Sequence, residues 1–166
     1  MSTHLYFQVE VSGSRGWWHF GRLMLSADYL LFALLAGVRA DDVGLPAAER
    51  GVPKGLPEHW AEPTLREDSL VVDDEAANLE VPDTCTRADA EAWVSRGDAW
   101  FLEDRNRVTH PDASGHSWVS VSELRAIREA YAARNGRDVV AVDAALALLA
   151  AWETGGNECR AVFWFG

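Results

Sequence analysis

Three side chains of the types that bind metal ions lie close together in the sequence, as His110, Asp112 and His116. Imidazole nitrogens and carboxylate oxygens are zinc ligands, so a metal held here would support a metal-dependent hydrolase. Zinc also needs a fourth position and hydrogen-bond partners for its ligands, and the sequence guarantees neither. Pro111 and Gly115 favour a turn in which these polar groups bond backbone amides. We therefore expect no metal and no cofactor, and keep the three residues as weak candidates.

Aromatic residues close to arginines suggest a second chemistry, the binding of a small ligand such as a nucleotide. The chain has eight tryptophans, and Trp17 and Trp18 are adjacent. Neighbouring strand residues point to opposite faces, so we expect one to be buried and the other to be exposed unless a helix or loop covers it. An exposed Trp can stack on a base while an Arg holds a phosphate. The candidate ligand-binding residues are Trp17, Trp18, Arg22, Tyr29, Arg39, His116 and Ser117.

Signatures of catalysis are missing from the sequence. There is no Gly-x-Ser-x-Gly elbow, no Walker loop and no His-Glu-x-x-His. The two cysteines, Cys85 and Cys159, are far apart and form no Cys-x-x-Cys pair, so we expect reduced thiols, with Cys159 buried on a strand. Nothing in the sequence therefore favours an enzyme over a binding protein.

The N-terminal part of the chain predicts a hairpin followed by a helix. Residues 4–11 alternate between apolar and polar types, which indicates a strand with one buried face, and a glycine-rich turn joins it to a second strand over 17–25. Ser26 is expected to cap a helix over 27–39 that is apolar nearly all round and therefore buried against the sheet. Arg39 would then end this helix, where a cation complements the helix dipole.

The remaining segments complete an α+β pattern. We expect short strands at 70–73 and 100–102, and a helix over 87–96 capped by Thr86 and stopped at Gly97. Ser120 and Glu123 fit a capping box that opens a helix ending at 135–136. A second helix covers about 140–152, and an apolar strand over 159–165 pairs inside the sheet with the N-terminal hairpin. The expected fold is one α+β domain over 1–166, an antiparallel or mixed sheet packed against three to four helices.

The negative charge of the chain is concentrated in its middle. The net charge is −11, and residues 41–104 alone carry seventeen carboxylates against five cations. This segment, with five of the six prolines, is expected to be a loop-rich, solvated insertion. An acidic field repels phosphate backbones, so we expect no direct binding of nucleic acid. The alternative is that residues 58–104 imitate a polyanion and occupy the nucleic-acid groove of a host enzyme, with Asp73, Asp74, Glu75 and Glu80 as the contacts.

No apolar run in the sequence reaches the roughly 20 residues that a membrane span requires. The first ten residues also lack the basic and apolar regions of a secretion signal. We therefore expect a cytoplasmic protein that does not bind membranes. A hairpin or terminal strand at a sheet edge could pair with its symmetry mate, so a homodimer is a further expectation.

Four short blocks resemble a family of uncharacterised accessory proteins of tailed bacteriophages and prophages. Residues 29–39 resemble its Tyr-x-Leu-Phe core and Leu-Ala-x-Val-Arg ending, and residues 50–57 its Arg-Gly-Leu-Pro turn with an insertion. Residues 117–124 resemble its Ser-Trp-Leu-Thr-x-x-Glu-Leu block, and residues 162–165 its closing Val-Phe-Trp-Phe strand. The blocks cover about a third of the chain, leave out the acidic stretch 64–104, and depart from the family in the loop over 41–57. The resemblance implies phage origin, an accessory role and the cytoplasm of a bacterial host, but no reaction.

The function expected from these features is a non-enzymatic, phage-type accessory protein. It would sequester a host-made ligand, such as a nucleotide immune signal, or block a host defence protein, and so serve immune evasion. The alternative hypothesis is an acidic inhibitor of a nucleic-acid-binding enzyme, and the third hypothesis is a metal-dependent hydrolase.

Overall fold

The computed structural model describes residues 4–25, 28–135 and 139–166 of the chain. It confirms the α+β class, with the N-terminal hairpin and the C-terminal strand in one sheet. The sequence suggested one domain with an insertion, and the structure groups the chain into two compact units. Unit 1 comprises residues 1–61 and 115–166, and unit 2 comprises residues 62–114. Each unit is described by itself.

Unit 1 is built on a four-stranded sheet in the order β2-β1-β8-β7. Strands β1 (Leu5–Gly13) and β2 (Gly16–Leu25) form the antiparallel hairpin, and β8 (Cys159–Phe165) pairs antiparallel with the other side of β1. Strand β7 (Ser114–Ser120), which the sequence did not indicate, lies beside β8. Strand β2 lies at an edge of this sheet, where a second copy of the chain would pair in the expected homodimer. The homodimer stays a prediction.

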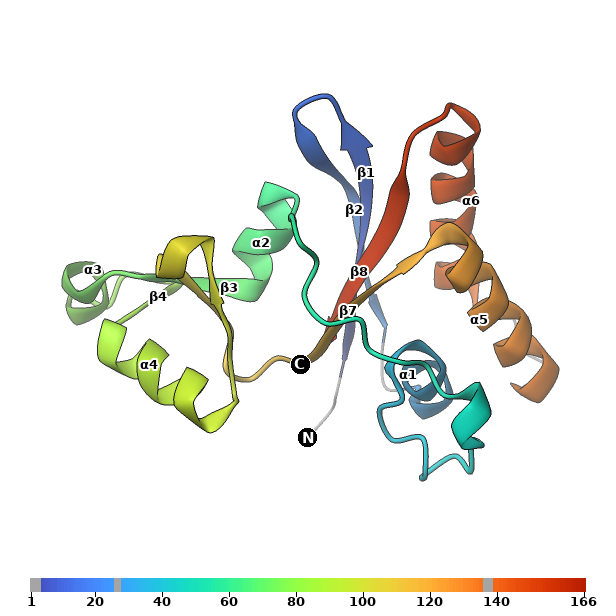
Figure 1. The fold of residues 1–166 in the computed structure, drawn as a ribbon, viewed down its shortest axis with the longest axis horizontal. Helices are drawn as coiled ribbons and strands as arrows, with labels where there is room; N and C mark the ends of the chain where they lie inside the picture. The colour runs from blue at the N-terminus through green and yellow to red at the C-terminus, as the bar shows by residue number, and fades with distance from the viewer. Residues whose placement is uncertain (1–3, 26–27, 136–138) are drawn as a thin grey trace. The chain divides into compact units, whose positions relative to one another are not determined.

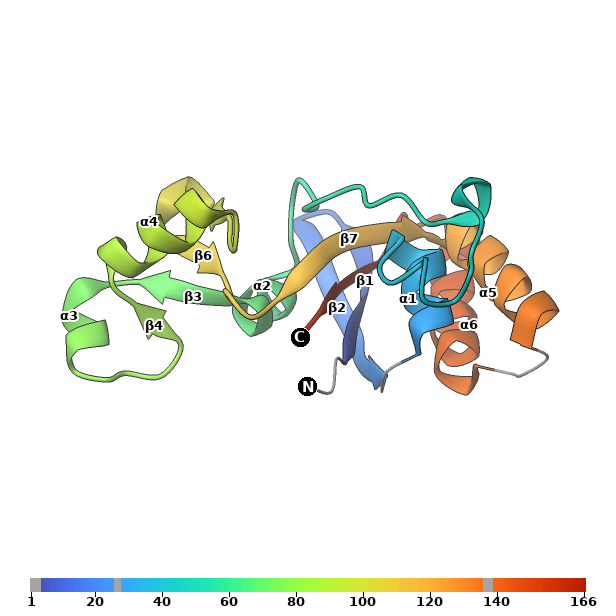
Figure 2. The ribbon, with the colours of Figure 1, turned by 90° about the horizontal axis from the view of Figure 1, so that it is seen from below.

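Three helices pack against the sheet of unit 1. They are α1 (Tyr29–Ala36), α5 (Val121–Asn135) and α6 (Val140–Thr154), and they lie on the same side of the sheet (Figure 1, Figure 2). The apolar core lies between them and the face of the sheet that carries Phe7 and Phe163. The apolar surface that the first strand and the last helices predicted is therefore buried in one place, as expected for an α+β layer.

Helix α1 begins and ends at other residues than the sequence suggested. Asp28 is its N-cap, because its Oδ1 accepts a hydrogen bond from the backbone N–H of Leu31 at 3.0 Å, and Ser26 lies outside the described residues. The helix ends at Ala36 because Gly37 adopts a left-handed φ of 69°. Arg39 therefore lies beyond the helix, and its expected role at the helix C-terminus is wrong.

The second face of β1 also carries buried residues, so the expectation that this strand has one buried face was wrong. Gln8 and Glu10 on β1 are both completely buried, and so is most of Arg160 on β8. Tyr6 stacks on Trp164 of the same face, with 5.6 Å between the ring centroids. The alternation of the sequence predicted the strands, but a polar residue in a strand can be buried when it is hydrogen-bonded.

Residues 41–61 are irregular, as the sequence indicated, with one 3₁₀ turn, η1 (Ala47–Glu49). Unit 2, in contrast, has regular structure where an irregular insertion was expected. Its sheet has the order β4-β3-β6-β5, with β3 parallel to β4 and antiparallel to β6. Its elements are α2 (Glu62–Asp68), β3 (Ser69–Val72), α3 (Asp74–Asn78), β4 (Thr84–Cys85), α4 (Arg87–Arg96), β5 (Phe101–Leu102), the 3₁₀ turn η2 (Glu103–Arg105) and β6 (Arg107–Thr109).

The expected ends of α4 are confirmed. The hydroxyl of Thr86 accepts a hydrogen bond from the backbone N–H of Asp89 at 3.1 Å, and Gly97 adopts a left-handed φ of 80° after the last turn. Among the helices of the described residues, none combines the length and the apolar character needed to cross a membrane.

Candidate functional site

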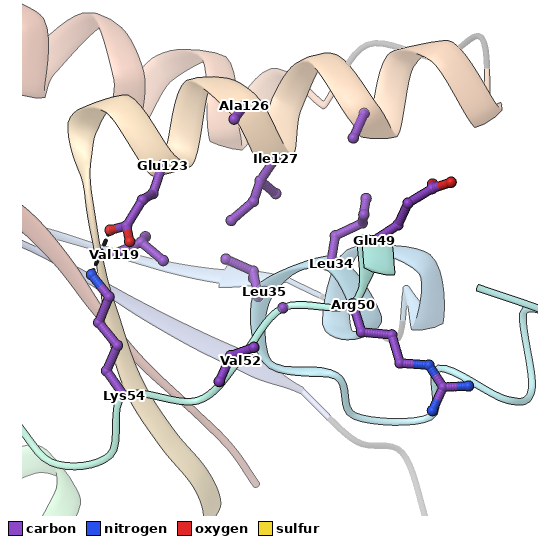
Figure 3. A pocket seen from close by; sticks show the side chains of 12 residues that line it. Leu34, Leu35, Glu49, Arg50, Val52, Lys54, Val119, Glu123, Ala126 and Ile127 are labelled. Carbon is purple, nitrogen blue, oxygen red and sulfur yellow. Dashed lines mark hydrogen bonds and ion pairs between the residues drawn. The ribbon is translucent and has the colours of Figure 1, made fainter. Parts of the chain in front are cut away.

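An open groove of about 360 Å³ in unit 1 is the best candidate for a binding site. It lies between α1, α5 and residues 49–54. We call this segment, which begins at the last residue of η1, the strap. Figure 3 shows Ile127 of α5 facing Leu35 of α1, with Val52 of the strap beside them. The apolar lining consists of Leu34, Leu35, Val52, Val119, Ala126, Ile127 and Ala130. The size is at the lower end of the range for small-molecule sites.

Val52 is an exposed apolar side chain at the groove. Its side chain is 80% exposed, the highest value among the exposed large apolar residues of the described part of the chain. It stands over the groove, where a bound apolar group would cover it. Because apolar surface gains free energy when it leaves water, an occupant would be stabilised by Val52 as well as by the floor of the groove.

A glycine allows the strap to cross α1. The backbone N–H of Gly51 donates to the carbonyl oxygen of Ala33 at 3.0 Å, so the two backbones approach closely. A Cβ at this position would lie 2.3 Å from the carbonyl oxygen of Leu34, which is too close for any side chain. Gly51 therefore has a structural role, because it lets the strap lie directly on the backbone of α1.

Ser117 holds the other end of the strap. Its hydroxyl, almost completely buried on β7, accepts a hydrogen bond from the backbone N–H of Lys54 at 2.8 Å. The strap is thus attached to α1 at Gly51 and to the sheet at Lys54. These two attachments fix where the Lys54 side chain leaves the backbone.

The side chain of Lys54 closes one end of the groove. Its Nζ donates a hydrogen bond to Oε2 of Glu123 at 2.6 Å (Figure 3). The same nitrogen lies 3.9 Å from the centre of the Trp118 ring. The ammonium therefore has an anion on one side and an aromatic face on the other, and both stabilise a positive charge. Lys54 is the only lysine in the chain.

Glu123 belongs to the capping box that the sequence predicted, and the structure confirms it. Its Oε2 accepts hydrogen bonds from the backbone N–H and from the hydroxyl of Ser120, both at 2.8 Å. Partial burial favours the neutral acid, but the hydrogen bonds from Lys54 and Ser120 and the charge of Lys54 outweigh it. The pKa of Glu123 therefore lies below its ordinary value.

Two further ion pairs lie at the opposite end of the groove. Nε of Arg134 donates to Oε2 of Glu49 at 2.9 Å, and Arg50 pairs with Asp41 while its Nε donates to the carbonyl oxygen of Leu45 at 3.0 Å. The groove is thus an apolar surface with internally paired charges at both ends. Such an arrangement suits an amphipathic occupant better than a highly charged one.

The structure distributes the seven residues predicted to bind a ligand over several places. Arg39 lies over the ring of Tyr29 at 4.7 Å, so these two are brought together. Trp18 is 57% exposed and lies opposite Val11, on the other face of the strand from Trp17.

The other candidates lie elsewhere in unit 1. Arg22 lines a smaller cavity of about 110 Å³. His116 is buried and stacks on Trp164, with 6.3 Å between the ring centroids. Only Ser117 touches the groove, through Lys54.

Trp17 instead belongs to a buried polar cluster on the second face of the sheet. The guanidinium of Arg160 lies 3.6 Å from the centre of the Trp17 ring and donates to Oε2 of Glu10 through Nε at 2.8 Å and through a second nitrogen at 2.7 Å. Burial lowers the pKa of Arg160, and Glu10 opposes that shift. Oε1 of Glu10 accepts from the backbone N–H of Ala61, and Arg160 also donates to the carbonyl oxygen of His59. The cluster therefore holds the segment before unit 2 onto the sheet.

The weak metal candidates do not form a ligand set. Nδ1 of His110 accepts a hydrogen bond from the backbone N–H of Asp112 at 3.3 Å, which agrees with a turn. Within the described residues, no group of three or more His, Cys, Asp or Glu side chains is placed to hold a metal ion. Both cysteines are free and buried, and burial raises the pKa of their thiols above the ordinary value. Cys159 lies buried on the last strand as predicted.

The groove residues Lys54, Val52 and Ile127 were missed by sequence reasoning. Lys54 is separated from Glu123 by 69 positions, so spacing gives no hint of their contact. One signal was available, however, because Lys54 is the single lysine of the chain.

Comparison of the chain with protein-family models, with curated proteins and with solved structures finds no match. The functional assignment therefore depends on the geometry described above.

Proposed function

We propose that this protein is a non-enzymatic binding protein that captures a small amphipathic ligand in the groove between α1, α5 and the strap. The observation that carries the proposal is the apolar groove itself, which exposes Val52 and has charged groups only at its ends. The sequence resemblance implies a phage-type accessory protein, and sequestration of a host-made molecule by such a protein is consistent with this site. No aromatic ring is among the groove's lining residues, so the site favours an apolar body over a nucleobase.

A substitution that fills the groove tests the proposal. Ala126 lines the groove on α5 and is exposed, so Ala126→Phe places a ring in the space that a ligand would occupy. Ala133 is exposed on the same helix but does not line the groove, and Ala133→Phe is the matched control. We expect a small co-purifying mass in native mass spectra of the wild type and of Ala133→Phe, and its loss from Ala126→Phe. The same mass on all three proteins would show that the ligand binds elsewhere.

A second candidate function is supported by the distribution of charge. Unit 2 contains fourteen Asp and Glu residues against five Arg, a net charge of −9 out of −11 for the whole chain. Thirteen of these carboxylates are exposed. Asp73 and Asp74 accept hydrogen bonds from the backbone N–H groups of Ala76 and Arg87, and Glu75 and Glu80 are exposed beside them. We propose, as the second candidate, that this acidic face, defined as the surface that carries Asp73, Asp74, Glu75 and Glu80, occupies the basic groove of a host nucleic-acid-binding enzyme.

The test of this second function neutralises the acidic face without removing its hydrogen-bond acceptors. The variant combines Asp73→Asn, Asp74→Asn, Glu75→Gln and Glu80→Gln. Salt-sensitive inhibition of a host nuclease by the wild type, lost in this variant and kept in Ala126→Phe, would support the acidic inhibitor. Equal inhibition by the wild type and the fourfold variant would contradict it.

A further inference from the structure

We infer that the groove takes a molecule with an apolar body and a single carboxylate, and that Lys54 binds this carboxylate. The inference rests on the proposed function, because it names the class of ligand for the same groove. It starts from Lys54, which lies at the border between the apolar lining and solvent.

Lys54 has hydrogen-bonding capacity left over. An ammonium has three N–H donors. Among the described residues, Nζ of Lys54 donates one hydrogen bond, to Glu123, while the Trp118 ring offers a face and no strong acceptor. The side chain is 32% exposed, so a molecule in the groove can reach it. Two donors are therefore available to an acceptor at the edge of the apolar lining.

The structure also holds this ammonium in position before a ligand arrives. The backbone of Lys54 is bound to Ser117, and its side chain is held between Glu123 and Trp118. A flexible lysine normally loses rotamer freedom when it binds a ligand, and a prepositioned one loses less. The site is thus ready for an anionic group at this end.

A cationic head group would be less favourable at the same place. It would meet the ammonium of Lys54, which repels another cation, and the nearest carboxylate, Glu123, already accepts hydrogen bonds from Lys54 and Ser120. Glu123 also caps α5, so drawing it away would remove the capping box as well as the lysine contact. Lys54, in contrast, can bind an anion while it keeps Glu123.

A single negative charge fits better than two. The carboxylate of Glu123 lies 2.6 Å from the ammonium, so it repels any anion that approaches Lys54. Arg50, the other cation of the lining, is already bound to Asp41 and to the carbonyl oxygen of Leu45. A monoanionic carboxylate meets less repulsion than a phosphate dianion, and the apolar lining supplies the remaining free energy.

Four octyl compounds with different head groups test the inference on the full-length protein. The probes are octanoate, octan-1-ol, octylammonium and octyl phosphate, with dissociation constants measured by titration calorimetry for the wild type, Lys54→Met and Ala126→Phe. We expect octanoate to bind the wild type about fivefold tighter than octan-1-ol, as one partly exposed ion pair would give. Octylammonium and octyl phosphate should bind no tighter than the alcohol. In Lys54→Met the advantage of octanoate over octan-1-ol should vanish, while octan-1-ol still binds.

A second measurement uses the single lysine directly. Acetylation of Lys54, followed by peptide mass spectrometry, should slow when octanoate is bound and slow less with octan-1-ol at equal occupancy. Equal affinities for octanoate and octan-1-ol, or a preference that survives Lys54→Met, would overturn the carboxylate inference and leave the groove as an apolar site. If no octyl compound binds, or if Ala126→Phe binds them all as the wild type does, the proposed function itself fails.

Discussion

Nζ of Lys54 lies 2.6 Å from Oε2 of Glu123, and this contact joins the strap to the first turn of α5. Glu123 is at once the partner of the lysine and the capping residue of the helix, so the charged end of the groove and the start of α5 depend on one carboxylate. The geometry of the site is therefore coupled to the stability of the start of α5.

Glu123→Gln should lower stability at neutral pH and have little effect in acid. The folded protein holds the pKa of Glu123 below its ordinary value of 4.5, so the charged form stabilises the fold above that pH. This contribution is lost as the pH falls through the lower, folded-state pKa. Because the side chain is 43% exposed, we expect a loss of less than about 1 kcal/mol at pH 7. Urea denaturation of both proteins from pH 7 down to pH 3 measures the difference, and a difference that stays constant over this whole range would contradict the prediction.

Gly51→Ala should destabilise the protein strongly. The added Cβ would meet the backbone of Leu34 and Leu35 at 2.3–2.4 Å, so the strap would have to move off α1. We expect a loss of about 3 kcal/mol or more in the free energy of unfolding. Gly21→Ala is the control, because nothing lies within 4 Å of the place that its added methyl group would take, and it should change stability by less than about 1 kcal/mol. Similar midpoints of thermal unfolding for the two variants would refute the close approach.

Ser117→Ala should loosen the strap at Lys54. The substitution removes the acceptor of the Lys54 N–H, and the loss of one such part-buried hydrogen bond costs about 1 kcal/mol. Hydrogen exchange of the Lys54 amide should become faster than in the wild type. Ser95→Ala, at an exposed serine of α4, should leave this amide unchanged. Unchanged exchange in Ser117→Ala would mean that the hydrogen bond does not hold the strap.

Arg160→Met should be far more harmful than the loss of a surface ion pair. It leaves the completely buried Glu10 without its cation, which costs about 3–5 kcal/mol. Asp143→Asn, which weakens the half-exposed pair with Arg128, should cost less than about 1 kcal/mol. Adding Glu10→Gln to Arg160→Met should restore part of the lost stability, because no buried charge is then left unpaired. Equal losses for Arg160→Met and Asp143→Asn, measured by urea denaturation, would contradict the buried pair.

Local patterns in the sequence predicted much of the fold but little of the site. The alternation in residues 4–11, the capping box at Ser120 and the apolar final strand each depend on neighbouring residues, and each is confirmed. Burial of Glu10 could not be predicted, because its partner Arg160 follows 150 positions later. The groove was missed for the same reason, since it is assembled from α1, the strap and α5. Sequence reasoning instead favoured aromatic and arginine residues, which the structure places mostly outside the groove.

The most direct test of the account is methyl NMR spectroscopy of the protein during a titration with octan-1-ol. We expect saturable changes in the chemical shifts of the methyl groups that line the groove, which belong to Leu34, Leu35, Val52, Val119 and Ile127. These shifts should be absent from Ala126→Phe and present in Ala133→Phe. Shifts that are confined to other methyl groups, or that persist unchanged in Ala126→Phe, would contradict the claim that this groove is the binding site.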